Sequence, residues 1–199
     1  MSIAKYTQAL QGFLQIEPNS KKLKPYVQYR IGKMFCYGLG TEQNYEKAFE
    51  WFERSAKQKN KFAQFSLANL YYYGSGIEKD LSQAFLWYQR SSSQGQPYAA
   101  YSIAQMYRYG EYVTKDNDTA QRYYKQALSG FLKIESDDMA NDDLFYKLGQ
   151  MFKIGLWFCQ YHLTHFIRTR IMKRERYDHS RAFFGLPEAV RRWRCRFFC

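Results

Sequence analysis

Apolar positions recur along this chain at intervals of 36 residues. The segment 31–35 (IGKMF) is matched by 67–71 (LANLY) and then by 103–107 (IAQMY). Ile31, Met34 and Phe35 are spaced so that they share one face of a helix, which we expect over residues 26–37. A fixed period of this size is typical of a repeat array, so the pattern predicts an all-α solenoid.

One position of this first helix, helix A of each repeat, always carries a small residue. Gly32 is matched by Ala68, Ala104 and Gly149. A small side chain there lets the paired helix approach closely, so we expect tight packing at this position.

Glycine follows each helix A. A left-handed residue at a helix C-terminus is usually glycine, so the helices are expected to end at Gly38, Gly74 and Gly110. A second glycine, Gly40 or Gly76, predicts a tight turn in the first two repeats. Tyr112 takes that place in the third repeat, and we expect a different turn there.

A second helix, helix B, follows each turn. The first is expected over Asn44–Gln58, and its equivalents begin at Asp80 and Asp116. Asn and Asp are strong N-cap residues because their side chains accept hydrogen bonds from unpaired backbone amides. About seven repeat helices are predicted between Met1 and Gly155. The expected packing face of the first helix B comprises Ala48, Trp51, Phe52, Ser55 and Ala56.

The repeats divide the chain into three parts. Residues 1–25 form a partial repeat, because 8–17 match 126–135 and the chain therefore opens inside a helix B. The simplest interpretation is that Met1 is not the natural start of the array. Residues 26–155 hold the repeats, at about 30–65, 66–101 and 102–146, with the start of a fourth at 147–155. The third repeat is the longest, and its surplus falls in 129–143.

The pattern stops at Leu156. Residues 156–199 hold all three histidines, three of the four cysteines and most of the arginines, whereas lysine nearly disappears. This change, at the point where the repeat breaks, favours an out-of-frame or poorly ordered tail. A genuine basic cap is the alternative, since terminal repeats are often atypical. More than half of the net charge of +12 lies in this tail.

Composition argues against several classes of protein. The chain contains no apolar run of the roughly 18 residues that a membrane span needs, and residues 1–10 do not resemble a signal peptide. Only Cys36 lies in the repeats, so a disulfide-stapled secreted scaffold is not indicated and a cytoplasmic location is predicted.

Catalytic and metal sites are not predicted either. Residues 1–155 contain no histidine, no glycine-rich phosphate loop and no Gly-x-Ser-x-Gly motif, so we predict no enzyme activity and no cofactor. The tail residues Cys159, His162, His165 and Cys195 lack the two close ligand pairs of a structural zinc site.

Two groups of side chains are candidates for contact with a partner. Tyrosines recur just before each turn, and aromatic residues on the concave face of a solenoid are common anchors for a bound peptide. The candidate partner-binding residues are Tyr37, Tyr72, Tyr73 and Tyr109. The candidate nucleic-acid contacts are Lys21, Lys22 and Lys24 after the first helix and Arg192 and Arg194 in the tail. Ordinary solvated charge is the simpler interpretation of the lysines.

The motif resembles the Sel-one-like repeat, a relative of the tetratricopeptide repeat with a longer period. The likeness covers residues 26–155 and includes the turn 37–40 (YGLG) and the helix B segment 48–52 (AFEWF). It implies a right-handed α-solenoid of antiparallel helix pairs that acts as a non-catalytic scaffold for protein–protein interaction. The likeness weakens at the third turn and is lost after Gly155.

A narrower resemblance gives an alternative function. The segment 126–132 (QALSGFL), with the long acidic connection after it, is similar to the C-terminal repeat region of relaxases from mobile elements of Gram-positive bacteria. This implies a fragment of a DNA-mobilisation protein that contributes to DNA or relaxosome binding. The histidine metal site that a relaxase needs is absent from residues 1–155. Association of the basic, aromatic tail with a membrane surface is a third hypothesis.

The end repeats generate a first prediction. Each repeat of a solenoid contacts only its neighbours, so an array cut at both ends exposes apolar faces. We therefore predict marginal stability or self-association through the end repeats. Extending the chain by a complete upstream repeat is expected to raise its Tm, measured by thermal denaturation. An unchanged Tm contradicts this interpretation.

Overall fold

The computed structural model describes residues 3–19, 21–133, 147 and 150–151. These residues form seven α-helices and no β-strand. The chain divides into two compact units, 1–127 and 128–199, and helices α1 to α6 with most of α7 belong to the first. The helices are α1 (Ile3–Ile16), α2 (Lys24–Tyr37), α3 (Tyr45–Lys57), α4 (Lys61–Tyr73), α5 (Leu81–Ser93), α6 (Pro97–Tyr109) and α7 (Asn117–Lys133).

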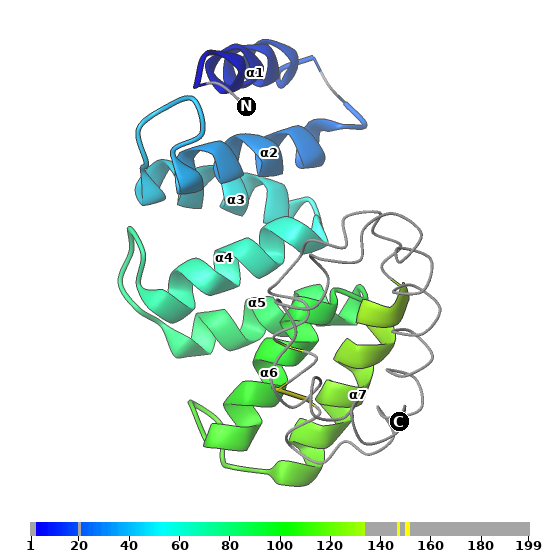
Figure 1. The fold of residues 1–199 in the computed structure, drawn as a ribbon. Helices are drawn as coiled ribbons and strands as arrows, with labels where there is room; N and C mark the ends of the chain where they lie inside the picture. The colour runs from blue at the N-terminus through cyan, green and yellow to red at the C-terminus, as the bar shows by residue number, and fades with distance from the viewer. Residues whose placement is uncertain (1–2, 20, 134–146, 148–149, 152–199) are drawn as a thin grey trace, which may run out of the picture. The chain divides into compact units, whose positions relative to one another are not determined.

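The helices of the first unit pack in chain order (Figure 1). Helix α1 packs on α2, and each following helix through α6 packs on the one before it. Helices α2, α4 and α6 are the predicted helices A, and α3, α5 and α7 are the predicted helices B. Helix α1 takes the place of a helix B before α2. The prediction of an all-α repeat solenoid is confirmed.

Each helix A ends in the same hydrogen-bonded turn. Gly38, Gly74 and Gly110 have φ angles of 65°, 69° and 74°, which lie in the left-handed region. The amides of each glycine and of the residue after it donate to one shared carbonyl oxygen, which is that of Met34 in the first repeat. The predicted glycine C-caps are confirmed.

Polar side chains cap the helices B. The side-chain oxygens of Asn44, Asp80 and Asp116 accept hydrogen bonds from backbone amides two or three residues further on. The pKa of Asp80 is lowered, first by the hydroxyl of Ser82 and then by the backbone amide of Gln83, because both donate to the charged carboxylate. The predicted N-caps are confirmed.

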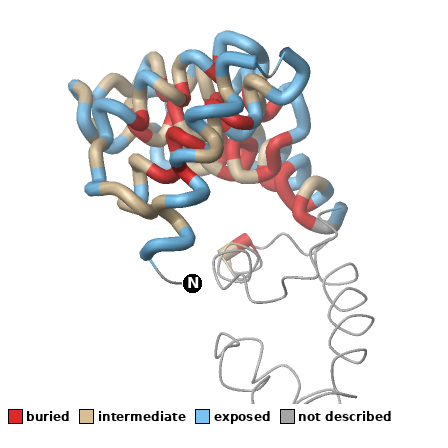
Figure 2. Tube along the Cα trace, turned by 90° about the horizontal axis from the view of Figure 1, so that it is seen from above, coloured by how far each residue is buried: buried red, intermediate tan, exposed pale blue. Residues whose placement is uncertain are grey.

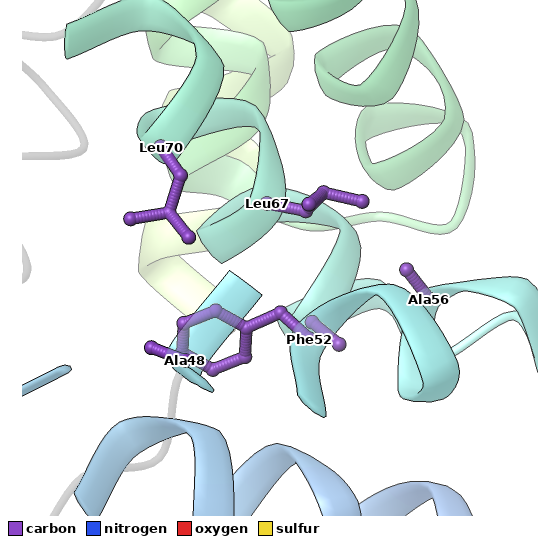
Figure 3. Packing of buried hydrophobic residues seen from close by; sticks show 6 residues of the cluster. Ala48, Phe52, Ala56, Leu67 and Leu70 are labelled. Carbon is purple, nitrogen blue, oxygen red and sulfur yellow. The ribbon is translucent and has the colours of Figure 1, made fainter. Parts of the chain in front are cut away.

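The core lies between successive helices, and the solvent-exposed residues lie on the outside (Figure 2). Phe52 and Ala56 of α3 meet Leu67 and Leu70 of α4 in the space between the two helices (Figure 3). Gly32 of α2 lies directly against Phe52, since a Cβ at that position would stand 2.7 Å from two ring carbons. The close approach expected at this small residue is therefore present in the first repeat.

The packing face of the first helix B is largely as expected. Four of its five expected members are buried, namely Ala48, Phe52, Ser55 and Ala56. Trp51 is only half-buried, and the guanidinium of Arg54 lies 4.9 Å from its ring. The pair Trp87–Arg90 repeats this arrangement in α5 at 4.5 Å.

Aromatic pairs recur at the same interval of 36 residues. Within each repeat, a ring of helix A packs against a ring of helix B, in the pairs Tyr29–Phe52, Phe65–Tyr88 and Tyr101–Tyr124 at 6.0, 5.9 and 5.5 Å. Between repeats, rings of successive helices A meet in the pairs Tyr29–Phe62 and Phe65–Tyr98 at 5.8 and 5.9 Å. Such pairs contribute about 0.5–1.5 kcal/mol each beyond their buried area. They hold α2, α4 and α6 side by side.

Side-chain amides also link the two helices in each of the first two repeats. Gln58 Nε2 donates to Gln28 Oε1 at 2.6 Å, and Gln94 repeats this bond to Gln64 at 2.6 Å. The hydroxyl of Ser55 donates to the Pro25 carbonyl, and 36 residues later the hydroxyl of Ser91 donates to the Lys61 carbonyl. Because a buried polar group without a partner is costly, these bonds favour one register of helix A against helix B.

The third repeat replaces these bonds. Ala100 and Gly130 stand where the glutamine pair would be, and Ala127 stands in place of the serine. Instead, Gln126 Nε2 of α7 donates to the carbonyl and the hydroxyl of Ser92 in α5, both at 3.1 Å. The polar link here therefore joins two helices B.

The third turn corrects a sequence expectation. Tyr112 has a φ of 66°, close to the 74° of Gly40 and the 72° of Gly76, so the expectation of a different turn was wrong. A Cβ on Gly76 would stand 2.5 Å from the Cβ of Tyr45, whereas Tyr112 places its ring 5.6 Å from that of Phe85. The third turn thus keeps its backbone conformation but leaves room for a side chain against the preceding helix B.

Part of the expected organisation lies outside the described residues. This holds for the tail 156–199 and for most of the fourth helix A at 147–155. It also holds for most of the surplus of the third repeat at 129–143, beyond the end of α7. These boundaries therefore stay predictions.

The close approach at Gly76 is testable against Gly95. Both glycines have positive φ, 72° and 75°, but a Cβ at Gly95 would have no atom within 4 Å. Gly95→Ala is expected to lower the free energy of unfolding by about 1 kcal/mol, the cost of a left-handed alanine. Gly76→Ala is expected to cost about 2 kcal/mol more, because backbone must move. Chemical denaturation measures both, and equal losses would show that the turn does not contact α3 tightly.

The cap at Asp80 generates a prediction about pH. The folded-state pKa of Asp80 lies below its ordinary value, so the carboxylate stabilises the folded chain above that value. This contribution is lost as pH falls through the lowered pKa. Asp80→Asn is expected to keep the cap, as Asn44 does, and to give a shallower decline of Tm between about pH 5 and pH 2.5. Parallel declines in both proteins would exclude this role, and Asp80→Ala serves as the uncapped control.

Candidate partner-binding surface

Helix α2 presents one stripe of side chains to solvent. Tyr26, Arg30, Lys33 and Tyr37 are separated by four, three and four residues, so they share one face of the helix. Tyr26 and Tyr37 expose 46% and 60% of their surface. The guanidinium of Arg30 donates to the Tyr26 hydroxyl at 3.3 Å, and the ammonium of Lys33 lies 5.5 Å from the centre of the Tyr37 ring. The stripe therefore has an aromatic residue at each end and two cations between them.

The same stripe recurs in α4 and α6, with neutral polar residues in its middle. Its members are Phe62, Ser66, Asn69 and Tyr73 in α4 and Tyr98, Ser102, Gln105 and Tyr109 in α6. The terminal rings of Tyr73 and Tyr109 are 71% and 63% exposed. Because the ring pairs described above hold the helices A side by side, we treat the three stripes as one surface, the helix-A row.

The polar middle of the row rests on tyrosines beneath it. Asn69 Oδ1 accepts a hydrogen bond from the Tyr88 hydroxyl at 2.7 Å, and Gln105 Nε2 donates to the Tyr101 hydroxyl at 2.7 Å. Tyr88 is almost fully buried, and this burial raises its pKa, so the hydroxyl stays protonated as the donor. The row is therefore fixed to the core of the repeats.

The helices A carry no acidic residue. Helices α2, α4 and α6 contain the bases Lys24, Arg30, Lys33, Lys61 and Arg108 and neither Asp nor Glu. Helix α3, in contrast, pairs Arg54 with Glu50 and Lys57 with Glu53. Of the five helix-A bases, only Lys24 takes part in an ion pair within the described part of the chain, with Glu17 at 3.8 Å.

Tyr72 lies beside the row and joins two repeats. Its hydroxyl donates to Glu111 Oε2 at 2.5 Å, and its ring stands edge-on to that of Tyr73 at 4.9 Å. Burial raises the pKa of Tyr72, and so does the hydrogen bond to the Glu111 carboxylate. Since Glu111 belongs to the loop after α6, Tyr72 links the second repeat to the third and supports the exposed ring of Tyr73.

The candidate nucleic-acid contacts are not brought together in the described residues. Lys21 and Lys22 are exposed in the turn before α2. Lys24 begins α2 and pairs with Glu17. Arg192 and Arg194 lie outside the described residues, so contact with nucleic acid stays a prediction.

Sequence reasoning identified one end of the row and missed the other. It identified Tyr37, Tyr73 and Tyr109 from their place before the turns. It missed Tyr26 and Phe62, which are 46% and 42% exposed at the opposite end. The residue eleven positions, or three helical turns, before Tyr37, Tyr73 or Tyr109 lies on the same helix face. Applying this spacing would have identified the aromatic residue at the other end of each stripe and, in α2, the two cations between them.

The helix-A row offers groups that can bind a partner, and the described residues add little reactive chemistry to them. Among the described residues there is no group of three or more side chains that could hold a metal ion. Cys36 is a free, half-buried cysteine, and burial raises the pKa of its thiol, which makes it a weak nucleophile. None of the described helices combines the length and the apolar character needed to cross a bilayer.

Comparison with known families decides the relationship. The Sel1 repeat model matches residues 25–60, 61–96 and 97–130, which together make up more than half of the chain. The chain belongs to the Sel1 repeat family. Each matched segment contains one helix A and most or all of the following helix B. Repeats of this family generally act as scaffolds for protein interaction.

Solved structures support the fold. A Sel1 repeat protein from Oxalobacter formigenes is similar with a TM-score of 0.57 and 22% identity, over 75% of this chain and 64% of that one. A protective antigen of uropathogenic Escherichia coli strains that displays an SLR fold also gives a TM-score of 0.57, with 19% identity, over 83% of this chain and 38% of that one. This Sel1 chain thus spans less than two thirds of either protein. A search of curated proteins found no match.

Proposed function

We propose that this Sel1 repeat protein is a non-catalytic scaffold that binds a protein partner along the helix-A row. The observation that carries the proposal is the repeated stripe with an exposed aromatic residue at its end. Tyr37, Tyr73 and Tyr109 occupy the same position in three successive repeats, and each exposes more than half of its surface. Tyrosine is enriched among the residues that dominate binding energy at interfaces, because it combines a large apolar ring with a hydroxyl group.

The supports beneath the row favour binding with little rearrangement. The stripes lie on helices rather than loops, and ring pairs and buried hydrogen bonds hold those helices together. A preorganised surface loses less conformational entropy when it binds, so more of the contact energy appears as affinity. Tyr72 contributes in this proposal by holding Tyr73 in place, and it becomes a direct contact if the partner displaces Glu111.

A cytoplasmic location is part of the proposal. Its support is the unpaired Cys36 in the first repeat, because free cysteines persist in reducing compartments.

The alternative, a fragment of a DNA-mobilisation protein, has less support. The resemblance to relaxases rests on segment 126–132, and Gln126 of this segment uses its side chain to bridge α7 to Ser92 of α5. A packing role therefore accounts for that residue. The bases on the helices A support nucleic-acid binding only if they contact phosphate groups. Binding measurements with a duplex decide whether they do.

The proposal is tested by selection of binding peptides. A library of random 12-residue peptides would be panned against the whole chain, and the selected peptides measured by fluorescence anisotropy. The triple variant Tyr37→Ala, Tyr73→Ala, Tyr109→Ala is expected to weaken their binding at least about tenfold, since truncated interface tyrosines commonly cost more than 1 kcal/mol each.

Tyr112→Ala is the matched control. Tyr112 is also an exposed tyrosine, at 56%, but it lies in a loop and not on the row. Its loss is expected to leave peptide binding unchanged. Peptides that bind the triple variant as tightly as the native chain would refute the proposed surface, provided that the variant keeps its helical circular dichroism spectrum.

A further inference from the structure

We infer that the helix-A row selects an acidic, extended segment of its partner, with the carboxylates seated on α2. This inference rests on the proposed function and adds the chemical class of the partner. It follows from the distribution of charge along the row, which differs between α2 and the two other helices A.

The cations of α2 are placed for a carboxylate. Arg30 and Lys33 stand between Tyr26 and Tyr37, and neither takes part in an ion pair within the described part of the chain. The guanidinium of the exposed Arg30 also lies 5.6 Å from the centre of the Phe13 ring of α1 and 6.0 Å from that of Tyr26. A guanidinium has five N–H groups, and the bond to Tyr26 uses one of them, so donors remain for a carboxylate.

Within the described part of the chain, no acid forms an ion pair with these cations. Glu17 pairs with Lys24 and accepts a hydrogen bond from Gln28 at 2.6 Å, and Glu111 accepts from Tyr72. The helices of the row contain no acid of their own. As far as the described residues go, the row presents positive charge without paired acids, and an acidic segment is its electrostatic complement.

Among the stripe positions themselves, charged residues occur only in α2, while Lys61 and Arg108 lie beside the stripe, 5.4 and 5.5 Å from the rings of Phe62 and Tyr109. The positions that carry Arg30 and Lys33 in α2 carry Ser66 and Asn69 in α4, and neutral polar residues again in α6. Neighbouring packed helices lie about 8–10 Å apart, so α2 and α6 are roughly 20 Å apart along the row. An extended chain rises about 3.3 Å per residue, so a bound segment crosses the row in about six residues. Its acidic residues are expected at one end, and apolar or aromatic residues at the other.

A polypeptide suits this row better than nucleic acid does. A duplex presents charge at every step, whereas four of the six middle positions in the row are neutral. The aromatic residues at the ends of the stripes, of which all but Tyr98 are exposed, match apolar side chains spaced along an extended peptide. DNA binding is therefore the competing outcome of the test.

The experiment compares the charge of selected peptides on matched variants. The 12-residue library would be panned on the native chain, on Arg30→Gln/Lys33→Gln and on Arg54→Gln/Lys57→Gln, and the pools sequenced. The native chain and the α3 control are expected to enrich Asp and Glu at one end of the peptide, and the α2 variant is expected to lose this enrichment. Replacing Glu by Gln in the tightest native peptide is expected to weaken binding about two- to fivefold, but to change nothing on the α2 variant.

Each outcome has a defined meaning. Selected peptides that need the row tyrosines but are neutral or basic would overturn the acidic partner and leave the scaffold proposal standing. A pool that ignores both the tyrosines and the cations would overturn both. A labelled 20-base-pair duplex that competes with the peptides and is lost with Arg30→Gln/Lys33→Gln would also overturn the inference, since the cations would then serve phosphates.

Discussion

The first pair of helices depends on one close approach, between a small residue of helix A and an aromatic ring of helix B. In the first repeat this is Gly32 against Phe52, with too little space for even a methyl group. In the same repeat the buried Gln28 accepts a hydrogen bond from Gln58, just after helix B, at 2.6 Å. Because the apolar contact is dense and the amide pair accepts only one register, the position of helix A is fixed to its partner.

The proposed binding surface is a consequence of this register. Tyr29 and Phe65 of the helices A are used in ring pairs with helix B, and the stripe beside them keeps its end tyrosines exposed. Repetition every 36 residues places these stripes next to one another. The aromatic ends of the row are then set by the fold, while the charge at its middle varies from repeat to repeat without affecting the core. Partner selection can thus change through Arg30 and Lys33 at little structural cost.

Much of the fold was readable from the sequence because its determinants are local. The C-cap at Gly38 and the N-cap at Asn44 depend on residues a few positions away, and both were predicted correctly. The turn at Tyr112 was not, because a left-handed tyrosine depends on the space left by the preceding helix B. The stripe partners of Tyr37 were missed for a similar reason. Exposure of Tyr26 and burial of Tyr29 follow from packing between repeats, and composition cannot distinguish two tyrosines three residues apart.

The most direct test of the close approach is to add one methyl group at Gly32 and one at Gly12. Both glycines are inside helices, but a Cβ at Gly12 has no atom within 4 Å, whereas a Cβ at Gly32 meets the Phe52 ring at 2.7 Å. Helix propensity alone favours alanine at both sites by about 1 kcal/mol. Chemical denaturation is expected to show that Gly12→Ala raises the free energy of unfolding and Gly32→Ala lowers it. An equal gain at both positions would contradict the account, because α2 and α3 would then have room to spare.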